Sequence, residues 1–134
     1  MTDDEYINSE ILDEHFRTPR NFGVLKDCTV EIIESNPTCG DTIVVDLKIN
    51  GETIEDVKYI TRGCSISTAA ASMLSETIIG KTLKEVENLS KAEVLSNIGL
   101  RLGPARERCA LISYDAVQKG IKKHLKGGKE AEHF

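Results

Sequence analysis

The chain reads TIVVDLKING at residues 42–51, which is its clearest strand pattern. Apolar side chains recur at every second position from Ile43 to Ile49, as they do in a strand with one buried face. The stretch ends in Asn50-Gly51, a strong signal for a tight hairpin turn because both residue types tolerate a positive φ. These residues therefore predict a strand that runs into a β-hairpin.

Strands are also predicted on both sides of this stretch. Residues 28–33 alternate in the same way and are followed by the break Asn36-Pro37-Thr38-Cys39-Gly40, while residues 54–61 come after the Asn50-Gly51 turn. Two hairpin-like connections in succession favour antiparallel pairing. We therefore expect a three-stranded antiparallel sheet.

Helical periodicity lies on both sides of the strands, with one predicted helix before them and four after them. The predicted helices lie at residues 4–17, 65–80, 82–87, 91–98 and 104–125. Three of them carry apolar stripes, formed by Ile7, Ile11, Leu12 and Phe16 in the first helix, by Ile66, Ala69, Ala70, Met73 and Ile78 in the second, and by Val117, Ile121 and Leu125 in the last. The expected fold class is α+β, a three-stranded antiparallel sheet with helices packed on one face, an N-terminal helix and a long C-terminal helix.

Length and composition limit the kind of protein. The 134 residues, 40% hydrophobic and 29% charged, predict one globular domain at 1–126 with a flexible tail at 127–134. The net charge of -5 argues against nucleic acid or a membrane surface as a partner, because binding phosphates needs a basic surface. The acidic N-terminus lacks the pattern of an export signal, and no apolar run is long enough to span a bilayer. We expect a cytoplasmic protein.

The four cysteines need an explanation other than disulfides, because the cytosol keeps thiols reduced. They are Cys28, Cys39, Cys64 and Cys109, and no two of them form a CxxC pair. Cys28 lies inside the first predicted strand, where a small buried hydrophobic side chain is the favoured interpretation. The other three lie at or near the ends of predicted elements. A metal site would therefore be assembled from separate parts of the fold.

Asp41 follows Cys39 by two residues, and glycines flank two of the cysteines at Gly40 and Gly63. Glycine lets the backbone come close to a ligand, so these loops can bring Cys39, Asp41, Cys64 and Cys109 together. Three thiolates and a carboxylate carry a formal charge of about -4, which requires a bound cation. Zinc(II) and a [2Fe-2S] centre both fit this requirement. The remaining charge can be offset by neighbouring arginines at Arg62, Arg106 and Arg108.

The chain resembles the iron-sulfur cluster assembly scaffolds of the IscU/NifU N-terminal type over most of residues 6–125. The resemblance is carried by His15-Phe16-Arg17-Thr18-Pro19-Arg20-Asn21, Asn36-Pro37-Thr38-Cys39-Gly40-Asp41, Gly63-Cys64-Ser65 and Arg108-Cys109-Ala110. It implies that Cys39, Asp41, Cys64 and Cys109 bind the metal or cluster. It also implies an assembly scaffold rather than an enzyme, which accepts sulfur from a cysteine desulfurase and builds a labile [2Fe-2S] cluster with iron. Apo iron-sulfur proteins would then be the acceptors.

Two features depart from the family pattern. Arg108 stands where the family usually has His, and since Arg does not ligate metal, Asp41 is the natural fourth ligand. The chaperone-binding LPPVK motif is replaced by Leu102-Gly103-Pro104-Ala105-Arg106, so an Hsp70-type chaperone is not an expected partner. Both Cys109, which the resemblance favours, and Cys64 remain candidates for the first sulfur acceptor. The sequence leaves a homodimer open.

Two other classes of protein fit the same cysteines. Arg before the last Cys is also a feature of SufU-type zinc-dependent sulfurtransferases, but those proteins have an insertion between the second and third Cys for which the interval from Cys64 to Cys109 leaves no room. A purely structural zinc site is the other alternative, and Asp41 disfavours it because structural zinc is bound mostly by Cys and His. The scaffold is the preferred interpretation.

Overall fold

The computed structural model describes residues 2–37 and 40–126. Within them the chain forms α1 (Asp3–Arg17), β1 (Val30–Asn36), β2 (Asp41–Asn50), β3 (Thr53–Arg62), α2 (Ser65–Ile78), α3 (Leu83–Glu87), α4 (Lys91–Ile98) and α5 (Pro104–Leu125). The predicted α+β class is confirmed. The predicted bounds of α4 and α5 agree with the observed ones.

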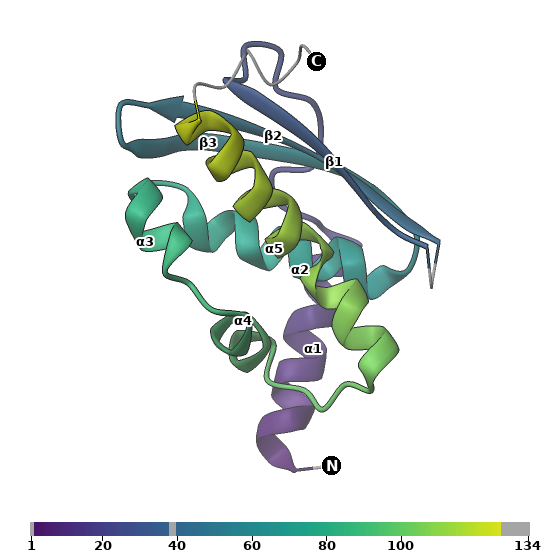
Figure 1. Ribbon diagram of the computed structural model, residues 1–134. Helices are drawn as coiled ribbons and strands as arrows, with labels where there is room; N and C mark the ends of the chain where they lie inside the picture. Colours follow the sequence, from purple (N-terminus) through teal and green to yellow (C-terminus); the bar gives the residue numbers. More distant parts are fainter. Residues whose placement is uncertain (1, 38–39, 127–134) are drawn as a thin grey trace.

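The strands form one antiparallel sheet in the order β1-β2-β3 (Figure 1). β1 pairs with β2 so that Asn36 lies opposite Asp41, and β2 pairs with β3 so that Thr42 lies opposite Arg62. The end of β1, the start of β2 and the end of β3 therefore lie at the same end of the sheet. This register brings the start of β2 close to the junction between β3 and α2.

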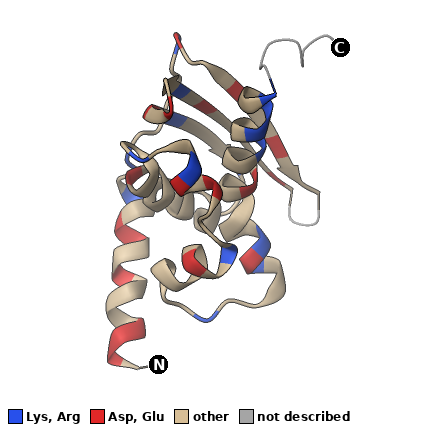
Figure 2. Ribbon diagram, turned by 60° about the vertical axis from the view of Figure 1, so that its left-hand side comes forward, with Lys and Arg blue, Asp and Glu red and all other residues tan. Residues whose placement is uncertain are grey.

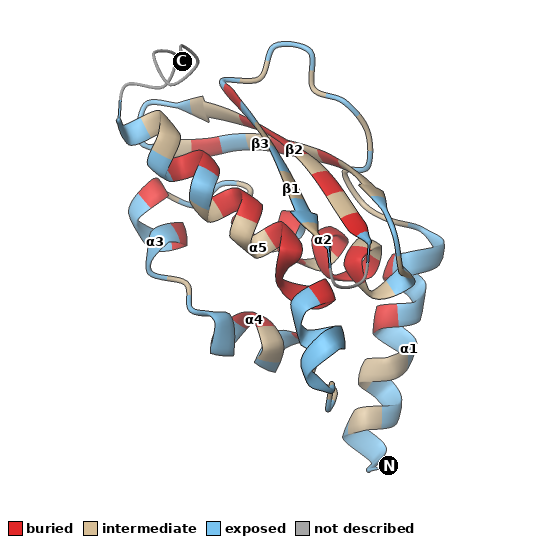
Figure 3. Cartoon of the chain, turned by 45° about the vertical axis from the view of Figure 1, so that its right-hand side comes forward, coloured by how far each residue is buried: buried red, intermediate tan, exposed pale blue. Residues whose placement is uncertain are grey.

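The helices α2 and α5 pack side by side on one face of the sheet. Figure 3 shows buried residues along both helices. This core includes Ile43, Val45, Leu47, Val57, Tyr59, Leu74, Ile78, Ile112, Ala116, Val117 and Ile121. At about 25 cal/mol per Å² of apolar surface removed from water, burial of this layer is the main force that holds the helices on the sheet.

Gly120 allows α5 to lie close to the sheet. A Cβ atom at this position would lie 3.0 Å from Cδ1 of Leu47 and 3.2 Å from Cγ1 of Ile32. Glycine inside a helix costs about 1 kcal/mol relative to alanine. The tight contact with β1 and β2 is the physical reason for a glycine at this position.

The apolar stripes of two helices are less buried than their pattern suggests. Of the four apolar residues in the stripe of α1, only Leu12 is buried, against Ala69, Ala70, Ile98 and Ala110. Ile7, Ile11 and Phe16 are 54%, 41% and 45% exposed, because α1 packs mainly against α2 on one side. In α5 Val117 and Ile121 are buried as expected, but Leu125 is 56% exposed at the end of the helix.

The first strand begins later than expected, and Cys28 is not in it. The N–H of Cys28 donates to the carbonyl of Leu25 at 3.2 Å in a turn, and ladder pairing with β2 starts only at Val30. The Cys28 side chain is half-buried rather than fully buried. The interpretation of Cys28 as a buried strand residue is therefore wrong, because the alternation continues across a turn that only the tertiary pairing defines.

Local hydrogen bonds fix the starts of three helices. Thr2 with Glu5, Thr82 with Glu85, and Ser90 with Glu93 form capping boxes at α1, α3 and α4. Acidic residues lie in the first turn of α1 and basic residues in the last turn of α5, an arrangement that favours both helix dipoles (Figure 2).

No helix among the described residues combines the length and apolar character needed to cross a membrane.

Candidate metal centre

Three of the four predicted ligands converge at one end of the sheet. Asp41 is the first residue of β2, Cys64 is the N-cap of α2, and Cys109 lies in the second turn of α5. One ligand atom from each residue can be chosen so that all three lie within 4.8 Å of one another. The fourth predicted ligand, Cys39, lies outside the described residues. Segments from three distant parts of the chain thus supply one cluster of metal-binding side chains.

Asp41 is tied to the first turn of α2 by both of its carboxylate oxygens. Oδ1 accepts a hydrogen bond from the backbone N–H of Cys64 at 3.0 Å, and Oδ2 accepts one from Oγ of Ser67 at 2.5 Å. The Cys64 thiol also points at Oδ2, with Sγ at 3.5 Å. Cys64 itself has no side-chain capping bond. Asp41 therefore caps α2 from the neighbouring strand and places a negative charge at its positive end.

The junction between β3 and α2 has room for this carboxylate because residue 63 is glycine. Gly63 has a φ of +141°, and a Cβ atom built on it would overlap the carboxylate of Asp41. Any other residue would be strained at this backbone conformation and would also displace Asp41. The glycine before Cys64 is therefore a requirement of the site and not only of the turn.

The residues present fit a thiophilic metal ion. Asp41 and Cys109 are 1% and 4% exposed, so charge on them is poorly solvated. In a tetrahedral site with bonds of about 2.0–2.3 Å, ligand atoms lie about 3.3–3.8 Å apart, so the observed spread requires little movement to close on an ion. Loss of the Cys64 proton would remove its hydrogen bond to Asp41 and leave two anions in contact. A cation in place of that proton restores the balance of charge.

The other residues considered from the sequence differ in their relation to this cluster. Arg62, Arg106 and Arg108 are all exposed, where solvent weakens their effect on the site. Their role in offsetting its charge stays a prediction. Cys28 is not a member of the cluster. Burial, followed by the carboxylate of Asp46, raises the pKa of its thiol, which makes it a poor nucleophile.

Ser67 was missed by the sequence analysis although it contacts two of the proposed ligands. Its Oγ lies 2.5 Å from Oδ2 of Asp41 and 3.6 Å from Sγ of Cys64. The only signal in the sequence is a Ser in the first turn of a helix whose inward face is otherwise rich in Ala. Such a residue is common at helix starts, so the signal is weak without the partner from β2.

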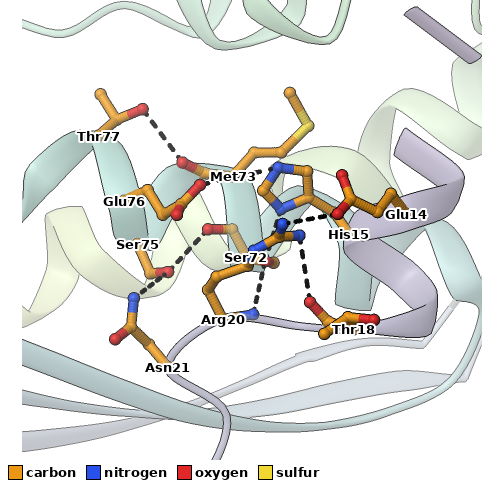
Figure 4. Close-up of polar contacts among 10 residues, drawn as sticks. All are labelled: Glu14, His15, Thr18, Arg20, Asn21, Ser72, Met73, Ser75, Glu76 and Thr77. Carbon is orange, nitrogen blue, oxygen red and sulfur yellow. Dashed lines mark hydrogen bonds and ion pairs between the residues drawn. The ribbon is translucent and has the colours of Figure 1, made fainter. Parts of the chain in front are cut away.

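The segment after α1 is anchored to α2 by a separate polar network (Figure 4). Nδ1 of His15 lies 2.7 Å from Oγ of Ser72, which also accepts the backbone N–H of Arg20 at 2.9 Å. The amide of Asn21 donates to Oγ of Ser75 at 2.9 Å. A cavity of about 400 Å³ beside His15 is lined by α1, α2 and α4 and contains none of the proposed ligands. The segment from His15 to Asn21 therefore joins α1 to α2 and does not contribute a ligand to the metal centre.

Residues 6–131 match the model of the family described as "NifU-like N terminal domain". The chain belongs to this family, whose members include iron-sulfur cluster assembly scaffolds of the IscU, SufU and NifU-like types. The structure is also similar to a solved structure described as a nitrogen-fixing NifU-like protein (N-terminal) from Brucella abortus. The TM-score is 0.76 at 23% identity, over 92% of this chain and 96% of the other. At that identity the likeness shows the fold.

Two curated relatives represent the two types left open by the sequence. The zinc-dependent sulfurtransferase SufU of Bacillus subtilis is 35% identical over 135 aligned positions, which cover 88% of this chain and 91% of the relative. The iron-sulfur cluster assembly scaffold protein IscU of Aquifex aeolicus is 36% identical over 120 positions, which cover 88% and 75%. Since 88% of 134 residues is about 118, about 17 positions of the SufU alignment have no counterpart in this chain. In the IscU alignment about two positions have no counterpart in this chain.

Proposed function

We propose that this protein is a scaffold on which a labile [2Fe-2S] cluster is assembled and from which it is transferred to apo-proteins. The observation that carries the proposal is the cluster of one carboxylate and two thiols, Asp41, Cys64 and Cys109, at the meeting point of three chain segments. Cys39, two residues before Asp41, is the remaining ligand of the proposal. Iron and sulfide are cargo in this function and not a resident cofactor.

The mixed ligand set supports release as well as binding. Proteins that keep their cluster usually offer four thiolates, whereas a carboxylate is a harder and weaker partner for an iron bridged by sulfide. Asp41 is also committed to hydrogen bonds with α2, from Cys64 and Ser67. A ligand that has these alternative partners gives the cluster a weak point from which it can leave.

Sulfur would enter by thiol exchange with a cysteine desulfurase. A thiolate of this chain attacks the terminal sulfur of the donor persulfide, the S–S bond of the donor breaks, and the desulfurase leaves as a thiolate. Each sulfur arrives at oxidation state zero, so an external thiol or electron-transfer protein supplies two electrons to convert it to sulfide. Cys109 is the acceptor favoured by resemblance, while Cys64 is the more exposed of the two in the structure.

An insertion that this chain lacks favours the scaffold over the sulfurtransferase. Within the aligned region, the Bacillus subtilis sulfurtransferase has about 17 positions without a counterpart in this chain, and the Aquifex aeolicus scaffold has about two. This difference agrees with the short interval from Cys64 to Cys109. The zinc-dependent sulfurtransferase is kept as the second candidate because Arg108 precedes Cys109, as in that type of protein.

The deciding experiment is metal and acid-labile sulfide analysis with visible absorption spectra on protein purified without oxygen. Iron and sulfide in equal amounts, lost in Cys109→Ala and kept in Cys28→Ala, are expected of the scaffold. Cys28→Ala is the matched control because Cys28 lies outside the cluster. Zinc alone, with no cluster formed after iron, cysteine and a desulfurase are supplied, would favour the sulfurtransferase instead.

A further inference from the structure

The Asp41 carboxylate has a dedicated partner in Ser67, which lies in the first turn of α2. Ser67 and Asp41 are each 1% exposed, and Oγ lies 2.5 Å from Oδ2. We infer that Ser67 is a positioning residue for the metal- or cluster-binding site, one that holds the Asp41 carboxylate toward the cysteines. The inference rests on the proposed function, because it concerns the ligand set named there.

The hydrogen-bond chemistry leaves the Ser67 hydroxyl little choice. A hydroxyl has one proton to donate, and a carboxylate can only accept, so Ser67 donates to Asp41. Its oxygen lone pairs remain free to accept from the Cys64 thiol, whose Sγ lies 3.6 Å away. Ser67 therefore links two proposed ligands, Cys64 at the start of its own helix and Asp41 on β2.

Positioning by Ser67 leaves coordination capacity on Asp41. Each carboxylate oxygen has two lone pairs, so Oδ2 can accept from Ser67 and still face the thiols, while Oδ1 accepts the N–H of Cys64 at 3.0 Å. Two bonds to one rigid helix turn define the rotation of the carboxylate. If the Ser67 hydroxyl is removed, only one of these two hydrogen bonds remains, the bond from Cys64 N–H to Oδ1. Oδ2 can then rotate away from the metal position.

Co²⁺ is a suitable probe of this arrangement, because its visible absorption reports the ligands and their geometry whether or not a cluster is ever assembled. The full chain would be titrated without oxygen as wild type, Ser67→Ala, Ser67→Thr, Asp41→Ala and the double variant. Ser75→Ala is the matched control, since Ser75 is another buried serine of α2 but bonds to the Ser72 carbonyl and to Asn21, away from the cysteines.

Ser67→Ala is expected to lower the affinity for Co²⁺ by roughly tenfold, the lower end of the effect of partners that orient metal ligands. Its visible bands should shift toward those of Asp41→Ala, and Ser67→Thr, which keeps a hydroxyl, should restore the wild-type bands. In the Asp41→Ala background, Ser67→Ala should change nothing further. Ser75→Ala should bind Co²⁺ like the wild type.

Two results would overturn the inference. Wild-type affinity and bands in Ser67→Ala would show that Asp41 does not need the hydroxyl, and an equal loss of affinity in both backgrounds would show that Ser67 acts on folding rather than through Asp41. Identical bands for wild type and Asp41→Ala would overturn the ligand set itself, and the inference with it. That last outcome separates failure of the proposed function from failure of the role of Ser67.

Discussion

Gly63 and Asp41 share one small space, since a Cβ atom on Gly63 would overlap the Asp41 carboxylate. Gly63→Ala should therefore displace Asp41 and abolish tight metal binding, and it should also cost about 1–3 kcal/mol of unfolding free energy because of its positive φ. The measurements are urea unfolding of the metal-free protein and Co²⁺ titration. Gly80→Ala is the control, because Gly80 also has a positive φ but nothing lies within 4 Å of a Cβ there. It should lose stability and keep metal binding.

Asp41→Cys should retain an assembled cluster longer than the wild type. The substitution replaces the single oxygen donor with a thiolate and completes the ligand set found in stable iron-sulfur proteins. Decay of the visible absorption and transfer to an apo-ferredoxin measure the effect. Transfer as fast as in the wild type would contradict the idea that the carboxylate is the weak point of the site.

Cys64 should be alkylated before Cys109 in the metal-free protein. Cys64 is half-buried at the start of α2, whereas Cys109 is 4% exposed on α5. Iodoacetamide treatment followed by peptide mass spectrometry gives the order, and unfolded protein, in which both should react alike, is the control. Faster alkylation of Cys109 would show that α5 opens in solution and would strengthen its candidacy as the first sulfur acceptor.

The stability of the metal-free protein should fall as the pH is lowered from about 6.5, and His15 should contribute to the loss. Burial, followed by the positive charge of Arg20, lowers the pKa of His15 in the folded state. The unfolded chain therefore binds the proton first, so the stabilisation is complete above about pH 6.5 and is lost as the pH falls through the folded-state pKa.

Urea unfolding at pH 7.5 and 5.5 tests this expectation. His15→Gln, which keeps a polar group near Ser72, should reduce the difference in stability between the two pH values. The same pH dependence in the wild type and His15→Gln would assign the loss to carboxyl groups instead.

Local signals predicted much of the fold. The alternation from Ile43 to Ile49 and the Asn50-Gly51 turn lie inside the hairpin of β2 and β3 that they predicted. The start of β1 was misplaced because the alternation through Cys28 is local, whereas a strand exists only where β2 pairs with it. The burial of α1 was overestimated for a similar reason. An apolar stripe in the sequence does not reveal how much of it a neighbouring helix covers.

For the candidate site, too, the sequence predicted some features and only the tertiary structure determined the others. Asp41, Cys64 and Cys109 could be chosen from the sequence because thiols and carboxylates bind metal ions through their own chemistry, whatever their neighbours are. That they lie within 4.8 Å of one another depends on the sheet register and on the packing of α5. The contact between Ser67 and Asp41 depends on the same packing, because it joins residues from two elements that meet only when the sheet and α2 come together.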